Sequence, residues 1–351
     1  MRVALDAAPL LDPPTGVGRY VRELALGLEA RGVDLARYAV ALRGRGDPSI
    51  ARWRVPARLA QAGWRRLGAP PISRLAGRAD VVHGTNFVLP ATGGAPGVVT
   101  VHDLSFERPD TFPGGERLRD LVPWSARRAA RVLVPSAAVA AEVTGRYGLA
   151  EHKVVVTHEG VSSVFFGAAP LAAGALAGLG IPGPFVVAVG TLEPRKNLAR
   201  LLRAWRLVRG RPEGWTLVLA GPRGWGPSLA ETPGVVMLGR VGDETLPGLL
   251  AAANVFCYPS VYEGFGLPPL EAMAAGTAAM VGRYSAAAEV LGDDALLVDP
   301  TSEDEMADAL LALMEDEALR TRYVTAGRAR AARYTWARTA GVTLGAYREA
   351  M

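Results

Sequence analysis

Several residue types are scarce in this chain of 351 residues, and each shortage limits what the protein can be. Cys257 is the only cysteine, which excludes an internal disulfide and fits a cytosolic setting. No apolar run reaches the ~20 residues of a membrane span, and residues 1–6 read as a strand, so we expect no signal peptide. No Asp-x-Asp pair or cluster with metal-ligand spacing occurs, so we expect no metal site.

Lysine is nearly absent, because Lys153 and Lys196 are the only two among 39 basic residues. Where arginine fills almost every basic position, a lysine within Pro194-Arg195-Lys196-Asn197 suggests a site that needs a compact ammonium group. Chance retention is the alternative explanation, so this observation only supports other evidence.

Charge is unevenly distributed along the chain. Residues 1–175 hold 22 basic and 15 acidic residues, a net +7, and the remainder holds −2, which together give the overall +5. A basic excess suits an acidic acceptor, a membrane surface or nucleic acid. The chain has no zinc-finger spacing, RNA-binding signature or helix-turn-helix signal, so we expect no nucleic-acid partner.

The strongest local excess lies in residues 43–78, which hold nine arginines and one acid. With Trp53 and Trp64, this stretch could lie on an anionic membrane and reach a lipid-linked acceptor. Pro56, Gly63 and Gly68 interrupt any long amphipathic helix there, so a solvated variable loop is the alternative.

Short apolar runs alternate with helical patterns from end to end, which predicts an α/β fold with parallel sheets buried on both faces. The expected strands are Arg2–Ala7, Leu35–Leu42, Val98–Val101, Arg131–Pro135, Lys153–His158, Phe185–Gly190, Trp215–Ala220, Val235–Leu238, Val255–Tyr258, Thr277–Val281 and Leu296–Val298. The expected helices are Gly18–Ala30, Glu116–Ala130, Ala137–Tyr147, Asn197–Val208, Thr245–Ala253, Pro268–Ala275, Glu303–Met314 and Leu319–Arg333.

The two series of strands are separated by a segment rich in Ala, Gly and Pro. We therefore predict two doubly wound Rossmann-like domains, residues 1–165 and 185–335, joined by a linker at 166–184 with one helical turn at most. Ligands of such sheets bind at the carboxyl ends of the strands, so we expect a cleft between the two domains.

The most informative motif is the run from Glu263 to Glu271, Glu-Gly-Phe-Gly-Leu-Pro-Pro-Leu-Glu. Its glycine turn lets backbone N–H groups approach a ligand closely, and its two prolines suit the first turn of a helix. The start of a helix favours anions, phosphate above all, and Glu271 one turn on can accept hydrogen bonds from a ribose. This combination predicts a nucleotide-sugar site. A strand-to-helix turn with two solvated glutamates is the alternative.

Arg195 and Lys196 follow another expected strand, and Asn197 is placed to cap the next helix. Two cations at this position can neutralise a diphosphate and stabilise it as a leaving group. A solvated basic helix start is the alternative, and the Glu263 turn favours the phosphate-binding interpretation.

These motifs carry a resemblance that covers nearly the whole chain and is most specific from residue 185 to 300. The runs 190–197, 255–260 and 263–271 are similar to those of retaining glycosyltransferases of family 4, which have the GT-B fold. The resemblance implies that residues 336–351 form a helix that crosses back to the first domain. It also implies metal-independent transfer of a hexose from a nucleoside diphosphate sugar to an acceptor hydroxyl, with the anomeric configuration retained.

The resemblance also assigns roles to individual residues. Arg195 and Lys196 grip the donor diphosphate, Glu263 binds hydroxyls of the hexose near the N–H groups of Phe265 and Gly266, and the helix beginning near Leu267 faces the phosphate. Glu271 binds the ribose, and the loop with Arg240 and Val241 pairs with the base. In the first domain Gly16 lies near the phosphate and the acceptor, and His102 contacts the transferred sugar or positions the reacting groups. Catalysis is thus assigned to Glu263, His102, Arg195 and Lys196, and Thr15, Gly18, Asn86 and Asp103 are candidates on the acceptor side.

The sequence departs from the family at two places near the donor. Ala278 stands where the family commonly has proline, and the run 283–290 lacks the usual proline before Glu289. The run Val101–Phe106 resembles mannosyltransferase-like members, which makes GDP-mannose the expected donor, with UDP- and dTDP-sugars as alternatives.

The acceptor is not specified by the sequence, and a saccharide, a lipid-linked sugar or a small molecule all fit. We expect a cytoplasmic enzyme, with peripheral contact at the inner membrane face as an option. A nucleotide-sugar epimerase and a non-catalytic nucleotide-sugar-binding protein are the rival functions. A glycoside hydrolase with paired carboxylates is discounted, because it has no need of a phosphate cradle.

Overall fold

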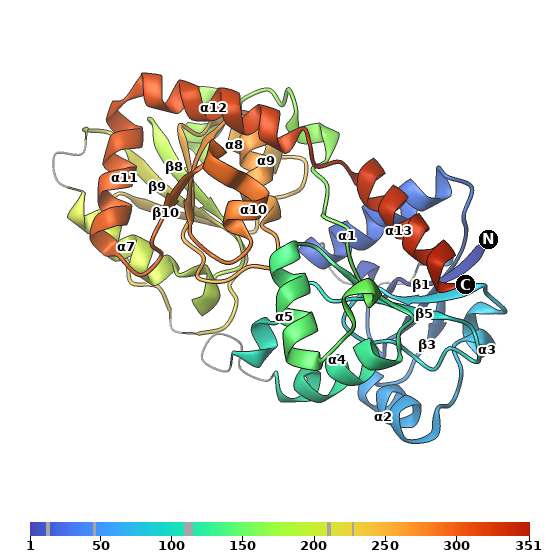
Figure 1. The fold of residues 1–351 in the computed structure, drawn as a ribbon. Helices are drawn as coiled ribbons and strands as arrows, with labels where there is room; N and C mark the ends of the chain where they lie inside the picture. Colours follow the sequence, from blue (N-terminus) through green and yellow to red (C-terminus); the bar gives the residue numbers. More distant parts are fainter. Residues whose placement is uncertain (12–14, 45–46, 109–114, 209–211, 227) are drawn as a thin grey trace. The chain divides into compact units, whose positions relative to one another are not determined.

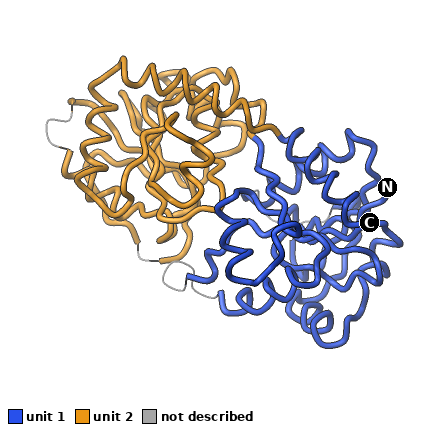
Figure 2. The backbone as a smooth tube through the Cα atoms, viewed as in Figure 1, with its two compact units in different colours: residues 1–160, 336–351 blue, residues 161–335 orange. Residues whose placement is uncertain are grey.

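The computed structural model describes residues 1–351 except 12–14, 45–46, 109–114, 209–211 and 227, and it shows two α/β units (Figure 1). The first unit comprises Met1–Gly160 and Trp336–Met351, and the second comprises Val161–Thr335 (Figure 2). Each unit is built on a parallel sheet with helices between its strands, which confirms the predicted fold class.

The sheet of the first unit has seven strands in the order β3-β2-β1-β4-β5-β6-β7, all parallel. The order reverses between β1 and β4, so the carboxyl ends of these two strands flank a topological switch point. The strands are β1 (Arg2–Asp6), β2 (Asp34–Val40), β3 (Ala51–Trp53), β4 (Val81–Gly84), β5 (Gly97–Thr100), β6 (Arg131–Val134) and β7 (Val154–Val156).

The helices of this unit pack on the sheet through apolar faces. Helix α1, for example, buries Tyr20, Val21, Leu24 and Leu28 at helical spacing. The α-helices are α1 (Gly16–Glu29), α2 (Ala57–Leu67), α3 (Ser73–Ala76), α4 (Glu116–Arg128), α5 (Ala137–Tyr147) and α13 (Trp336–Ala350), and the 3-10 turns are η1 (Ala8–Leu10), η2 (Ser105–Glu107) and η3 (Glu151–Lys153).

The sheet of the second unit has six parallel strands in the order β10-β9-β8-β11-β12-β13. Here the order reverses between β8 and β11. Apolar runs form the central strands because both faces of the sheet are covered by helices. The strands are β8 (Phe185–Val189), β9 (Thr216–Ala220), β10 (Val235–Gly239), β11 (Val255–Tyr258), β12 (Ala278–Gly282) and β13 (Leu296–Val298).

Helices α7, α11 and α12 of this unit cover one part of its core, where the largest buried side chain is Trp205. The α-helices are α6 (Ala173–Gly178), α7 (Leu198–Leu207), α8 (Leu246–Ala252), α9 (Leu267–Ala275), α10 (Ala287–Leu291), α11 (Glu303–Glu315) and α12 (Glu317–Ala331), and the 3-10 turns are η4 (Ser163–Phe165), η5 (Pro194–Lys196) and η6 (Gly292–Asp294).

The last helix, α13, belongs to the first unit and packs along α1 (Figure 1). A buried hydrogen-bonded chain ties it to the sheet. The Tyr347 hydroxyl lies 2.7 Å from Nδ1 of His83, whose Nε2 lies 2.8 Å from the Thr100 hydroxyl, and Thr100 also contacts the Tyr20 hydroxyl at 3.0 Å. Burial lowers the pKa of His83 to about 3, helped by the nearby charge of His102, so this imidazole is neutral near pH 7.

Two boundaries differ from those predicted. The division falls after Gly160, not residue 165, and the segment 166–184 is part of the second unit, not a separate linker. There the Leu171 N–H donates to the Gly248 carbonyl at 3.0 Å, which ties this segment to the start of α8.

Helix α2 corrects the solvated-loop alternative for residues 57–67. Ala60 and Trp64 are buried at helical spacing, and the helix ends at Gly68, whose φ of 61° is left-handed. Gly63 does not interrupt it, because the missing side chain leaves room for the Ala69 carbonyl, which would lie 2.7 Å from a Cβ.

Candidate active site

A cluster of charged side chains lies at the switch point of the second unit. Arg195 and Lys196 follow β8, and Glu263 follows β11, the neighbouring strand on which the order reverses. Since parallel strands end at one edge of the sheet, residues nearly 70 positions apart in sequence meet there. The structure thus brings together the residues that the sequence singled out separately.

Glu263 is the centre of this cluster and is only 7% exposed. Its Oε1 accepts a hydrogen bond from Lys196 Nζ at 2.6 Å, and its Oε2 pairs with the Arg195 guanidinium. Lys196 Nζ also lies 2.6 Å from the Tyr258 hydroxyl, and Glu193 Oε1 accepts from Arg195 at 2.8 Å. Two cations therefore face two carboxylates, and the four formal charges cancel.

The electrostatics of the cluster keep Glu263 ionised. Burial alone would raise its pKa, but the positive charges of Arg195 and Lys196 outweigh that effect and lower the pKa to about 2. Burial and the charge of Arg195 lower the pKa of Lys196, while Glu263 counteracts them. A carboxylate held this way accepts hydrogen bonds but is a poor proton donor near pH 7.

The turn after Glu263 is constrained by a close approach. Gly266 has a φ of 105°, and a Cβ there would lie 2.1 Å from the Tyr284 hydroxyl oxygen, so only glycine fits. Helix α9 begins at Leu267, one residue before the predicted start, with prolines in its first turn and no side-chain cap. Glu271, which the sequence predicted to bind the ribose, lies on the same helix one turn further along and is 3% exposed.

Asn197 occupies the N-cap position of α7 as predicted, but its side chain does not cap the helix. Its φ of 59° is left-handed and its side chain makes no capping bond. The amide instead donates to the carbonyls of Pro300 at 2.6 Å and Pro259 at 3.1 Å. These bonds hold the Arg195–Lys196 turn against the loops that follow β11 and β13.

Three donor candidates lie outside this charged cluster. The Phe265 ring is buried and packs edge-on against Tyr334 with centroids 5.5 Å apart, so only its backbone remains a candidate contact. Arg240 and Val241 follow β10, the edge strand two places from β8 in the sheet. They therefore follow a strand that β9 and β8 separate from β11 in the sheet.

In the first unit, His102 follows β5 and both of its ring nitrogens have partners. Nε2 lies 2.9 Å from the Thr85 carbonyl, which can only accept, so Nε2 carries a proton. Nδ1 lies 3.5 Å from Glu159 Oε1, and both side chains are about nine-tenths buried. The sequence missed Glu159 as this partner, although its position three residues after the end of β7 was a signal.

The residues of the glycine-rich corner after β1 have different structural roles. Thr15 caps α1, since its hydroxyl accepts from the Gly18 N–H at 3.1 Å, and a Cβ on Gly18 would lie 3.0 Å from the Pro9 carbonyl. Gly16 is exposed and would meet nothing within 4 Å, so the fold of this unit does not require glycine there. The rest of the motif, residues 12–14, lies outside the described residues.

Asp103 and Asn86 occupy different settings. Asp103 Oδ1 accepts from the Ser105 N–H at 2.8 Å, a local hydrogen bond in the turn before η2. Asn86 lines a cavity of about 250 Å³ at the carboxyl ends of β1, β2 and β4, together with Tyr38 and Trp64.

Asp6, which the sequence reading missed, lies in the same cavity. It ends β1 at the switch point of the first unit, a position that could have drawn attention to it. Burial raises its pKa to about 6, against the lowering effect of a hydrogen bond from the Ala8 N–H at 3.0 Å. A carboxylate beside two aromatic side chains and an amide suits a polyhydroxy ligand.

Within the described ranges, no group of three or more His, Cys, Asp or Glu side chains is arranged to hold a metal ion. The described helices also include none that is both long and apolar enough to cross a membrane.

Two family models match this chain in succession. Residues 14–165 match the model described as Glycosyltransferase Family 4, and residues 183–316 match the model described as Glycosyl transferases group 1. The first match lies almost entirely in the first unit, and the second lies within the second unit and contains the Glu263 cluster.

Among curated proteins, the chain is 32% identical over 287 residues to O-antigen chain mannosyltransferase B of Escherichia coli, which covers 76% of this chain and 74% of that protein. It is 36% identical over 187 residues to a phosphatidyl-myo-inositol mannosyltransferase of Mycolicibacterium smegmatis, covering 50% of this chain and 47% of that protein.

Among solved structures, sucrose-phosphate synthase of Thermosynechococcus elongatus aligns with a TM-score of 0.75 at 21% identity over 99% of this chain and 98% of that one. The glycosyltransferase WaaG aligns with a TM-score of 0.69 at 16% identity over 95% of each chain. At these identities the likeness concerns the fold alone.

Proposed function

The chain belongs to glycosyltransferase family 4 and is a glycosyltransferase, and from this premise we propose that it transfers a hexose from a nucleoside diphosphate sugar to an acceptor hydroxyl with retention of anomeric configuration. Mannose is the proposed sugar and GDP-mannose the proposed donor, because relatives that match 76% and 50% of the chain carry mannosyltransferase names.

The observation that carries this proposal is the cluster of Arg195, Lys196 and Glu263 at the switch point of the second unit. Both cations are largely buried, with 14% and 12% of their side chains exposed, and both pair with Glu263. A diphosphate brought to this edge of the sheet would take over hydrogen bonds from the cations, and Glu263 would then be free to accept from sugar hydroxyls. The uncapped start of α9 offers the Leu267 N–H as a further donor, since Pro268 and Pro269 have no N–H group.

In the proposed reaction the bond between the anomeric carbon and the diphosphate oxygen breaks, and a bond to the acceptor oxygen forms. Arg195, Lys196 and the start of α9 stabilise the negative charge on the leaving diphosphate. The acceptor proton passes to an oxygen of that diphosphate. We propose that no metal ion is needed, because these cations supply the positive charge.

The pKa of Glu263 argues against the hydrolase alternative. A glycosidase acid needs a raised pKa so that it carries a proton near pH 7. The pKa of Glu263 is lowered to about 2 by Arg195 and Lys196 in spite of its burial, so it cannot serve as that acid.

The acceptor is proposed to bind to the first unit, in the cavity of Asp6, Tyr38, Trp64 and Asn86. At pH 7 Asp6 is mostly ionised, since its raised pKa is about 6, and its carboxylate can orient acceptor hydroxyls. We propose a saccharide or lipid-linked acceptor and a cytoplasmic site of action, with peripheral membrane contact as an option.

Incubation with radiolabelled GDP-mannose and a panel of acceptors, with and without EDTA, tests the proposal. Labelled product with the α-anomeric configuration, formed equally in EDTA, is the expected result. Epimerised sugar nucleotide without acceptor would favour an epimerase, and binding without turnover on any acceptor would favour a binding protein. Loss of transfer in EDTA would contradict the metal-independent mechanism.

A further inference from the structure

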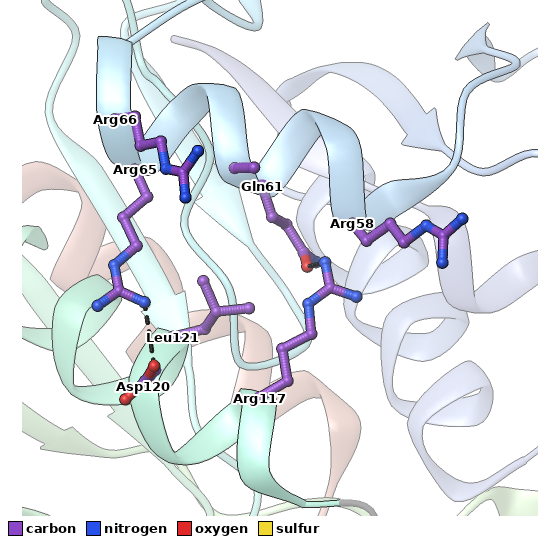
Figure 3. Close-up of a pocket in the computed structure, with 8 residues that line it drawn as sticks. Arg58, Gln61, Arg65, Arg66, Arg117, Asp120 and Leu121 are labelled. Atoms are coloured by element: carbon purple, nitrogen blue, oxygen red, sulfur yellow. Dashed lines mark hydrogen bonds and ion pairs between the residues drawn. The ribbon is translucent and has the colours of Figure 1, made fainter.

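The first unit contains a second cavity, of about 420 Å³, between α2 and α4. Figure 3 shows its lining side chains. Arg58, Gln61, Ala62, Arg65 and Arg66 come from α2, and Arg117, Asp120 and Leu121 come from α4. Four guanidinium groups against one carboxylate give the lining a formal charge of +3.

Internal contacts balance only part of this charge. Arg65 pairs with Asp120 at 3.2 Å, but these side chains are 48% and 68% exposed, so the pair is weak. Arg117 donates to the Gln61 side-chain oxygen, a neutral acceptor that joins α4 to α2. Within the described part of the chain, Arg58 and Arg66 have no carboxylate within ion-pair distance.

Two of the arginines stand where their own helices disfavour a cation. Arg58 lies in the first turn of α2, which has no acid there, and Arg117 lies in the first turn of α4 beside Glu116 alone. The positive end of a helix dipole repels such charges. Burial lowers the pKa of Arg117, and the charge of Arg58 lowers it further, so the two cations also repel each other. An anion between them would relieve both repulsions.

The cavity adjoins the proposed acceptor cavity. Gln61 lines both cavities. Ala57 and Trp64 line the acceptor cavity together with Asp6, and Ala62 and Arg65 line the cavity between α2 and α4 together with Asp120. A ligand that carries hydroxyl groups and a phosphate could therefore occupy the two together.

We propose that the cavity between α2 and α4 is a phosphate-binding site that holds the phosphate group of the acceptor. A guanidinium group can bind two phosphate oxygens at once. Arg58 and Arg117 each contribute such a group to the lining of the cavity. The phosphate belongs either to a soluble sugar phosphate or to a lipid headgroup. Its link to the acceptor rests on the proposed function, but phosphate binding does not.

Calorimetric titration with inorganic pyrophosphate tests the site directly. The titrations use the full chain with Lys196→Ala, so that binding at the proposed donor site is weakened. We expect the double variant Arg58→Gln/Arg117→Gln to weaken binding at least about tenfold, the loss of one to two charge-assisted hydrogen bonds. Arg74→Gln/Arg78→Gln removes the same charge from exposed positions outside the cavity and should change the affinity less than about twofold.

Equal weakening in both double variants, or no weakening in either, would overturn the proposal. Because no transfer is measured, failure here is distinct from failure of the glycosyltransferase reaction. Cosedimentation with phosphatidylglycerol and phosphatidylcholine vesicles then separates the two sources of phosphate. Loss of phosphatidylglycerol binding in Arg58→Gln/Arg117→Gln alone assigns the site to a lipid headgroup, and unchanged vesicle binding with lost pyrophosphate binding assigns it to a soluble phosphate.

Discussion

Lys196 Nζ donates a hydrogen bond of 2.6 Å to Glu263 Oε1, across the point at which the strand order of the second unit reverses. This bond joins the two motifs that the sequence marked as functional, and it neutralises the cation proposed to bind the donor diphosphate. Donor binding therefore requires an exchange of partners within a buried charged cluster, and this exchange governs the first predictions.

Replacement of Glu263 by glutamine should reduce both stability and activity. Arg195 and Lys196 would lose their shared carboxylate partner. Removing one partner of a buried ion pair lowers the stability of a protein by about 3–5 kcal/mol. We expect the free energy of unfolding in urea to fall by several kcal/mol and kcat/KM to fall at least about 100-fold.

The control for this change is Glu303→Gln, which removes the same charge from an exposed ion pair with Arg203 at 2.6 Å in the same unit. It should alter stability by less than about 1 kcal/mol. Equal effects of the two substitutions on unfolding would contradict the account of the buried cluster.

Removal of the Lys196 ammonium should weaken the binding of the nucleoside diphosphate product. A hydrogen bond to a charged group contributes about 1.5–3 kcal/mol, so we expect Lys196→Ala to raise the Kd for GDP by ~10–100-fold. Calorimetry measures this directly. Lys153→Ala, which removes the other lysine, lies in the first unit and should leave GDP binding unchanged. An unaltered Kd in Lys196→Ala would remove this residue from the donor site.

Gly266→Ala should distort the turn before α9. The new methyl group would lie 2.1 Å from the Tyr284 oxygen, at a φ of 105° that disfavours any side chain. We expect a loss of about 1–3 kcal/mol in unfolding free energy from the strain alone, and impaired donor binding.

Adding Tyr284→Phe to Gly266→Ala should recover part of that loss, because the phenyl ring lacks the oxygen that clashes. Gly174→Ala in α6 is the matched control, since its methyl group would meet nothing within 4 Å. It should be neutral or slightly stabilising. No difference between Gly266→Ala and Gly174→Ala would show that the turn is not constrained as described.

His83 should make the protein sensitive to acid. Burial lowers its pKa from 6.5 to about 3 in the folded state, so between these values the unfolded chain binds a proton that the folded chain does not. Stability therefore falls as pH drops from about 6.5 towards 3. We expect His83→Asn to lower stability at pH 7 through its lost bonds but to show a shallower decline between pH 6.5 and 4, measured by urea unfolding at each pH.

The exposed His152 provides the comparison, since His152→Asn should retain the slope of the unsubstituted protein. If His83→Asn also retains that slope, the buried imidazole does not titrate as stated.

The sequence predicted the class of fold because buried parallel strands read as apolar runs of a characteristic length, as in Phe185–Val189. It placed Glu263 and Lys196 at strand ends, which is enough to expect them at one edge of a sheet. It could not show that Glu263 is the partner of both cations, because this depends on which strands are neighbours at the switch point.

Other features depended on contacts between distant residues. Helix α2 was missed because its glycine at 63 looks like a helix breaker until the close approach of Ala69 is seen. Glu159 was not recognised as the neighbour of His102, because the two residues lie 57 positions apart in the sequence. Asp6 drew no attention because a single acid at the end of a strand has no motif around it.

The most direct test of the central claim is a crystal structure of the protein soaked with GDP-mannose. The account predicts that diphosphate oxygens lie within hydrogen-bond distance of Arg195 and Lys196 and close to the start of α9. It also predicts that Glu263 has turned from these cations to the sugar hydroxyls. A diphosphate bound away from the carboxyl ends of β8 and β11, with the Lys196–Glu263 bond intact, would contradict it.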